Sequence, residues 1–498
     1  MAYNRNIVAN YFGAASIAIV QIAFVPVYLR YLGIEAYGLV GVYVSLQALL
    51  TVLDAGVSLT LTREFARYKA GSVDAGSIRN LLRTVEIFFL AGGLGAGAIG
   101  WFSAPFISTY WLRSESLSIS TVECAVRVMG FLAVTRWWAG VYRSATAGLQ
   151  DMVWLNATGV AFAALRAAGV IAVLEWIAPD IKAFFIFQAL VSLAELWLVR
   201  RRVWQPLRLT GLGRFRPAEL LPLWRFTAHL SVILVIVVII MQADKIVLSK
   251  MLTLGDYGHY ALASAVAGSI GLLMQPIASV AYPRFVELNA RGERPDVVAA
   301  YHRYTQMVTI TLAPCAAVLA LFSHHILLLW VRDTAIVAIS APVLSLLAPG
   351  MMFFALLSIP NYLQLASGNA RVLVVVYGVS LTLYIPSLLL GIASFGMLGA
   401  GCAVLGAGAT IVAFGVFFMP GSSLSRRENW SWIVSDVLIP TLSSFIAATS
   451  VYLLTPLGDP AHPWVSFITV CLALSVAAVS ALLSCSVGRQ ILRRLATA

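Results

Sequence analysis

Several ionisable side chains lie inside long apolar stretches of this sequence, where a charge is costly and usually serves a function. Eight of them are candidate site residues: Asp54, Arg83, Arg136, Arg143, Arg166, Asp244, Lys245 and Arg303. Most are cations, and an arginine offers a planar fork that matches two phosphate oxygens. A cavity lined by these residues would therefore favour an anionic ligand, with phosphate as the obvious group. The six cations are the candidate substrate-binding residues, and Asp54 and Asp244 are candidates for coupling or gating.

The segment 121–148 is the most unusual of these stretches. Arg136 and Arg143 are seven residues apart, so they project from about the same face of a helix. Ala139 and Gly140 lie between them and leave room beside the two cations. The next apolar stretch carries Arg166 at its middle. These three arginines are the strongest candidates for a cationic cavity.

Each candidate also has a purely structural interpretation. Arg83 and Arg303 lie near the ends of their stretches, where a long side chain can reach the membrane interface. Asp244 and Lys245 could pair with each other, and Asp54 could bond to a helix end. Buried structural pairing is the alternative for Arg136, Arg143 and Arg166. The tryptophans beside them could stack on sugar rings or simply pack. The sequence leaves these alternatives open.

The elements that must position these residues are membrane-spanning helices. Of the 498 residues, 60% are hydrophobic and only 11% are charged, and the mean hydropathy is +0.90. A soluble domain needs about 25% charged residues, whereas a spanning helix needs about 20 mostly apolar ones. The sequence therefore predicts an all-α polytopic membrane protein with about 14 spans. The predicted spans are 7–30, 38–61, 80–104, 121–148, 152–176, 182–199, 221–248, 258–282, 301–331, 335–366, 372–393, 397–419, 432–455 and 463–486.

Lysine and arginine follow an alternating pattern in the joints between these spans. The joints after the second, sixth, eighth and twelfth spans are rich in arginine, whereas the opposite joints carry single cations at most. The positive-inside rule then places both termini in the cytoplasm. This one-sided distribution largely accounts for the net charge of +12 and argues against nucleic acid as a partner. The first apolar block has full membrane width, so no cleavable signal peptide is expected.

The sequence contains a weak internal repeat at a constant offset of 220 residues. Tyr37-Gly38 matches Tyr257-Gly258, and four further pairs share the offset: Leu32 and Leu252, Arg83 and Arg303, Tyr142 and Tyr362, and Gly148 and Gly368. We expect a six-helix lobe with a basic linker at 1–220, a second six-helix lobe at 221–420, and an extra helix pair with a basic tail at 421–498. An even number of spans per repeat gives a parallel repeat, with a central site between the lobes.

Several kinds of chemistry have no signature in this sequence. There is no Walker A motif for ATP. The six histidines and five cysteines show no metal-ligand spacing. The outer joints are too short for the extramembrane domain of a glycosyltransferase or ligase. We expect no cofactor, no metal and no enzymatic activity.

The stretch from Val25 to Arg67 carries a resemblance to a known family. A proline near the end of the first span, YLGIEAYGLVGVY, Leu53-Asp54-Ala55-Gly56 and Thr62-Arg63-Glu64 follow one another there, and LGDYG at 254–258 is a weaker second copy. This pattern resembles the Wzx-type polysaccharide (O-antigen or exopolysaccharide) flippases of the MOP superfamily, which also holds the MATE exporters and the MurJ-type lipid II flippases.

The resemblance implies two lobes around a central cavity that opens to alternate sides of the bacterial inner membrane. The implied substrate is an undecaprenyl-pyrophosphate-linked oligosaccharide, moved from the cytoplasmic to the periplasmic leaflet. Membrane lipids, a coupling cation (H⁺ or Na⁺) and polysaccharide polymerase or assembly proteins are the implied partners. The alternatives are a MATE-like small-molecule exporter, a MurJ-like lipid II flippase and, least favoured, a membrane glycan polymerase or transferase.

Overall fold

The computed structural model describes residues 2–54, 56–208, 213–216, 220–292, 294–418, 426–455 and 463–490. These residues are almost entirely helical, and within them β-pairing is limited to one isolated bridge between Arg113 and Thr253. Eleven of the described helical segments are long and apolar enough to cross a membrane. The predicted all-α polytopic membrane fold is confirmed. The chain divides into two compact units, Met1–Gly258 and His259–Ala498.

The predicted number of 14 spans is not confirmed, and two helices explain much of the difference. The predicted spans 372–393 and 397–419 lie in one continuous element, α14 (Ala370–Phe418). The predicted span 121–148 corresponds to α5 (Ile119–Gly148), a helix of 30 residues that carries three arginines and a glutamate. Its charge keeps α5 out of the set of apolar segments although its length suffices to cross the bilayer.

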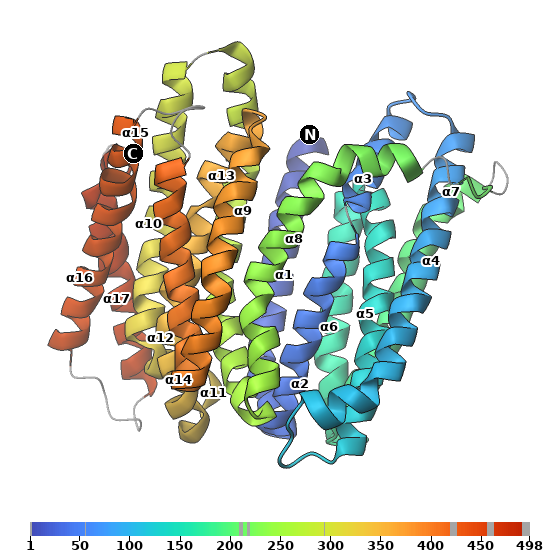
Figure 1. The fold of residues 1–498 in the computed structure, drawn as a ribbon, viewed down its shortest axis with the longest axis horizontal. Coiled ribbons are helices and arrows are strands. Elements are labelled where there is room, and N and C mark those ends of the chain that lie inside the picture. The colour runs from blue at the N-terminus through green and yellow to red at the C-terminus, as the bar shows by residue number, and fades with distance from the viewer. Residues whose placement is uncertain are drawn as a thin grey trace. The chain divides into compact units, whose positions relative to one another are not determined.

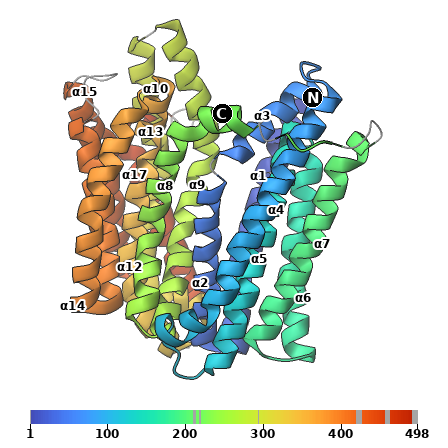
Figure 2. The same ribbon diagram turned by 45° about the vertical axis from the view of Figure 1, so that its right-hand side comes forward.

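The first unit is built around α5, which packs against α3, α4 and α7 (Figures 1 and 2). The helices of this unit are α1 (Ala2–Ala23), α2 (Val25–Leu53), α3 (Val57–Lys69), α4 (Ala75–Phe106), the π-helical turn η1 (Ile107–Trp111), α5, α6 (Met152–Trp176), α7 (Ile181–Arg208), α8 (Leu220–Met251) and the start of α9 (Leu254–Arg291).

Helix α4 begins at a well-formed cap. The Asp74 carboxylate accepts hydrogen bonds from the backbone nitrogen of Ser77 at 2.9 Å and from the Ser77 hydroxyl at 2.6 Å. These bonds stabilise the charged form and hold the pKa of Asp74 below its usual value. The cap satisfies backbone donors that the first helical turn would otherwise leave to water.

The stretch that carries the family resemblance folds as two helices separated by breaks. Helix α1 ends at Ala23, and Pro26 occupies the first turn of α2, where its missing N–H costs nothing. Gly33 interrupts α2 with a φ of +79°, a conformation that favours glycine. A second break separates α2 from α3, and Asp54 lies in it. The joint predicted between the spans 7–30 and 38–61 is therefore a backbone break at Gly33 inside a longer helical element.

We call the two matching segments around Gly38 and Gly258 the repeated corner, and these two segments contact each other within the first unit. A Cβ atom on Gly38 would overlap the backbone oxygen of Leu254, and one on Gly258 would overlap the backbone oxygen of Ile34. The two contacts are related by the same offset of 220 residues that the sequence repeat shows. Both glycines are therefore required because two backbones approach closely, which accounts for their presence in both copies of the motif.

A large apolar cluster in the interior of the first unit is contributed by α3, α4, α5 and α7. Phe65, Phe89 and Tyr142 are fully enclosed in it. Trp137 stacks on Phe89 with the ring centroids 4.3 Å apart, and Trp138 also packs against this cluster. These tryptophans of α5 thus contribute to the packing of the first unit, one of the two roles that the sequence left open.

The second unit contains the rest of α9 and a series of further helices. They are α10 (Arg294–Leu321), α11 (Ser323–Val331), α12 (Thr334–Leu356), α13 (Ser358–Ala366), α14, α15 (Arg426–Ser431), the π-helical turn η3 (Trp432–Leu438), α16 (Ile439–Leu454) and α17 (Pro463–Ser484). Helices α16 and α17 lie side by side and both pack against α10 (Figure 1).

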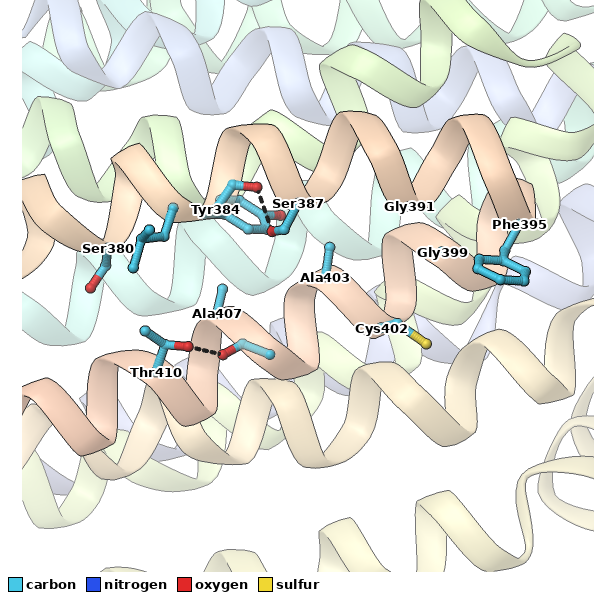
Figure 3. Close-up of a pocket in the computed structure, with 12 residues that line it drawn as sticks. Ser380, Tyr384, Ser387, Gly391, Phe395, Gly399, Cys402, Ala403, Ala407 and Thr410 are labelled. Atoms are coloured by element: carbon cyan, nitrogen blue, oxygen red, sulfur yellow. Dashed lines mark hydrogen bonds between the residues drawn. The ribbon is translucent and has the colours of Figure 1, made fainter.

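Helix α14 folds back on itself at Gly396, whose φ is +58°. Its two arms approach at Gly391 and Gly399, where a Cβ on either residue would overlap the other backbone. Between the arms lies a groove of about 390 Å³ (Figure 3). The hydroxyls of Ser387 and Thr410 bond to carbonyls of their own helix, so the groove is lined mainly by apolar groups.

A buried polar network joins the C-terminal helix pair to α10. Asp436 in η3 is 1% exposed and bonds to His302, and its other carboxylate oxygen accepts from Gln306 at 2.7 Å. The Gln306 side-chain oxygen accepts from the Ser486 hydroxyl at 3.1 Å and from the Val487 backbone nitrogen at 3.0 Å. Polar contacts thus fix both ends of the C-terminal segment to one helix.

Candidate functional site

The structure brings two of the three strongest candidates together at one buried carboxylate and places the third close by. Glu195 of α7 forms an ion pair with Arg143 of α5 through one carboxylate oxygen and with Arg166 of α6 through the other. Arg166 also donates to the Ser192 hydroxyl at 3.3 Å. Three helices therefore meet at Glu195. We call Arg136, Arg143, Arg166 and Glu195 the arginine cluster.

Arg136 completes this cluster from the α5 face that it shares with Arg143. Its guanidinium donates to the Tyr43 hydroxyl of α2 at 3.3 Å. It lies close enough to Arg143 and Arg166 to repel both electrostatically. Three cations and one carboxylate leave the cluster with a formal charge of about +2, because an arginine stays protonated in proteins.

Burial and bonding leave hydrogen-bond donors in the cluster without a partner. The Glu195 side chain is 3% exposed and that of Arg166 is 10% exposed, whereas that of Arg143 is 40% exposed. The Nε of Arg166 is buried and has no hydrogen-bond partner among the described residues. A buried unpaired donor is costly. An acceptor that reached Nε of Arg166 would satisfy this donor, and an anionic one would also offset the surplus positive charge.

A second buried carboxylate, Glu86 of α4, also binds two arginines but is fully bonded. One of its oxygens accepts from Tyr142, from Nε of Arg200 at 2.9 Å and from Nε1 of Trp204 at 2.7 Å, and the other accepts from Arg83 at 3.1 Å. We call these five residues the Glu86 cluster. It ties α4, α5 and α7 together.

The remaining candidates do not join the arginine cluster. Arg83 belongs to the Glu86 cluster, and Arg303 lies on an exposed face of α10 in the second unit. Lys245 pairs with its neighbour Asp244 at 3.3 Å and donates to the Met241 carbonyl at 2.9 Å. Asp54 accepts from the hydroxyl of Ser58 at 3.0 Å and from its backbone nitrogen at 3.3 Å, and so bonds to the first turn of α3.

Three buried acids were missed by the sequence reasoning: Glu86, Glu195 and Asp436. Glu86 and Glu195 lie inside predicted spans 80–104 and 182–199, and Asp436 lies near the start of 432–455. The rule that made the buried arginines candidates applies equally to these acids. Among the described residues, no group of three or more His, Cys, Asp or Glu side chains could hold a metal ion.

The family of the chain follows from a sequence comparison. Residues 4–289 match the model of a family described as polysaccharide biosynthesis protein, which is more than half of the chain. The chain belongs to this family. The match covers the whole arginine cluster and the repeated corner. A comparison with curated proteins finds no significant match.

Solved structures show that this polysaccharide biosynthesis protein has the MOP-superfamily fold. A lipid II flippase MurJ matches with a TM-score of 0.70 and 12% identity, over 95% of this chain and 97% of that one. An inward-facing multidrug resistance MATE transporter matches with a TM-score of 0.65 and 12% identity, over 82% and 92% of the two chains. A eukaryotic MATE transporter matches with a TM-score of 0.58 and 11% identity, over 86% and 99%. The resemblance to the MOP superfamily is confirmed.

Proposed function

We propose that this protein flips a polyprenyl-pyrophosphate-linked oligosaccharide from the cytoplasmic to the periplasmic leaflet of the bacterial inner membrane, with both termini in the cytoplasm. Membership of the polysaccharide biosynthesis family supports a role in glycan export. One structural observation carries the proposal. Arg143 and Arg166 meet at one buried carboxylate with Arg136 close by, which leaves surplus positive charge and an unpaired donor on Arg166.

The arginine cluster suits the pyrophosphate of such a substrate. Guanidinium groups bind phosphate oxygens in a bidentate manner, and the charge of the cluster would offset the cost of bringing that anion into the membrane. The polyprenyl tail can remain in lipid while the headgroup crosses. We propose alternating access driven by an ion gradient or by the membrane potential, which supplies about 2.3 kcal/mol per charge at 100 mV. Asp54, in the break between α2 and α3, is the proposed gating residue.

Complementation in a strain that lacks its own polysaccharide flippase tests the proposal. We expect Arg136→Ala and Arg166→Ala each to abolish surface polysaccharide while the protein stays in the membrane. Arg127→Ala is the matched control, because Arg127 is also on α5 but pairs locally with Glu123 four residues earlier. The control should retain activity. Full activity in both cluster variants would refute the assignment of the binding site.

A lipid II flippase is the second candidate, because the MurJ fold matches 95% of this chain. Both substrates would carry the same pyrophosphate, so the arginine cluster does not separate them. Rescue of a strain depleted of its lipid II flippase, without rescue of the polysaccharide-flippase mutant, would favour this candidate. A MATE-like exporter of organic cations is less favoured, because such a substrate calls for acidic groups and the cluster is cationic.

A further inference from the structure

Glu195 is the one acid in the arginine cluster, and it occupies the donors that an anionic ligand would need. Each of its two oxygens binds one arginine. The charged and titratable groups around it are Arg136 and Arg143 from α5, Arg166 from α6 and Tyr43 from α2, and Ser192 lies on its own helix. Glu195 therefore stands where a phosphate group would stand.

We propose that Glu195 competes with the anionic group of the substrate for Arg143 and Arg166, and that binding of this group displaces Glu195 and transfers a proton from solvent to its carboxylate. This inference rests on the proposed function, since it concerns the same site. One proton is added to one carboxylate oxygen for each anion bound, and no other bond is made or broken.

Burial explains why displacement brings a proton with it. While two guanidinium groups bind Glu195, its negative charge is compensated. An incoming anion takes over these donors and adds a second negative charge nearby. The carboxylate then stays in a 3% exposed site with fewer partners and a like charge beside it. Both changes favour its neutral form.

The competition is reciprocal. Since anion binding favours protonation of Glu195, protonation must favour anion binding by the same factor. The affinity for an anion should therefore rise as the pH falls. In the empty site, Glu195 holds the mutually repelling arginines in place, so their guanidinium groups are already ordered when the ligand arrives. A purely structural counter-ion would order the arginines too, but it would not exchange a proton on binding.

Proton uptake by the purified full-length protein in detergent tests the inference. Inorganic sulfate is the probe, because it does not titrate between about pH 6 and pH 8, so any proton taken up must go to the protein. Calorimetric titrations in two buffers of different ionisation enthalpy give the number of protons bound. We expect the wild type to take up a fraction of a proton approaching one per sulfate, and to bind more tightly at the lower pH.

Glu195→Gln removes the competing charge while keeping the shape of the side chain. We expect this variant to take up no proton, to bind sulfate about tenfold more tightly at pH 7.5 and to lose the pH dependence, where tenfold corresponds to about 1.4 kcal/mol. Inorganic pyrophosphate provides a second comparison. It tests whether the variant also binds the diphosphate group of the proposed substrate more tightly than the wild type does.

The outcomes separate the two proposals. If neither anion binds, or if Arg166→Ala binds as well as the wild type, the anion site itself is wrong and both proposals fail. If binding depends on Arg166 but the wild type takes up no proton with sulfate, Glu195 is a fixed counter-ion and only this inference is overturned. Weaker binding by a folded Glu195→Gln would also overturn it. Should that variant not fold, the wild-type proton count with sulfate still decides.

Discussion

Glu86 and Glu195 are both buried carboxylates at which α7 meets α5, and each binds two arginines, yet their surroundings differ. The Glu86 side chain accepts from Tyr142 and Trp204 as well as from Arg83 and Arg200. Glu195 accepts from Arg143 and Arg166 only, among the bonds observed. Tyr142 and Arg143 are adjacent in α5, so the two sites are neighbours along one helix interface.

The difference shows that the balance of donors and acceptors around a buried carboxylate separates a structural role from a ligand-binding role. At Glu86, four donors fill the accepting capacity of the two oxygens, and uncharged aromatic donors supply half of them. Around Glu195, three guanidinium groups bring far more donors than one carboxylate can accept, and Nε of Arg166 stays unpaired. A saturated carboxylate holds helices together, whereas an undersaturated cluster can take a ligand.

The largest expected effect is a difference in the stability lost when Glu86 or Glu195 is substituted. Glu86→Ala would leave the buried donors of Tyr142 and Trp204 unpaired and Arg200 without its carboxylate. We expect a loss of about 3–5 kcal/mol, the usual effect of breaking a buried ion pair. Thermal unfolding of the detergent-solubilised protein measures it. Glu195→Gln should lose much less, because the glutamine oxygen still accepts. Equal losses would show that both sites are structural.

A matched pair of tyrosine substitutions should give smaller effects, one on stability and the other on anion affinity. Tyr142→Phe removes one hydrogen bond to a buried carboxylate and should lower stability by about 1.5–3 kcal/mol, with sulfate affinity unchanged. Tyr43→Phe removes only the acceptor of Arg136 and should change anion affinity more than the unfolding temperature. Unfolding scans and sulfate titrations on both variants test the pair. A drop in anion affinity for Tyr142→Phe would contradict the distinction between a structural Glu86 cluster and an anion-binding arginine cluster.

The smallest expected effect comes from Asp74, an exposed carboxylate on the same helical element as Glu86. Asp74→Ala removes the α4 cap and should lower the unfolding temperature slightly at neutral pH. Because the Ser77 bonds lower the pKa of Asp74 in the folded protein, its contribution is complete above the unfolded-state pKa and disappears as the pH falls through the lowered one. Unfolding scans of wild type and variant should therefore converge at acid pH, once Asp74 is protonated in the folded protein. A difference that persists there would show a non-electrostatic origin.

Sequence reasoning predicted the membrane fold and named three of the four residues of the arginine cluster, Arg136, Arg143 and Arg166. The spacing of Arg136 and Arg143 placed both on one helix face, because helical periodicity is a local property. Their meeting with Arg166 at Glu195 depends on how α5, α6 and α7 pack, which no local pattern encodes. Glu86 and Glu195 could have been named on the same ground as Asp54 and Asp244, since each lies in a predicted span.

The limits of the sequence also show in the repeat and in the spans. The matched corners at Gly38 and Gly258 indicated a duplication, and their reciprocal close approach gives it a physical cause. The predicted lobe boundary near residue 220 stays a prediction. The joint between the two predicted spans in α14 is a single glycine, Gly396, which turns the backbone without a polar loop.

The buried bond between Asp436 and His302 has a consequence for biosynthesis. The ribosome delivers residues 432–484 to the membrane after α10 has already been inserted. A lone carboxylate in hydrocarbon is unfavourable, so η3 and α16 reach a stable position only on meeting His302 and Gln306. Stable packing of this helix pair therefore requires the preceding helices to be assembled first. A chain ending before residue 432 would present an unpaired polar face of α10 to the lipid and to the proteases that remove incomplete membrane proteins.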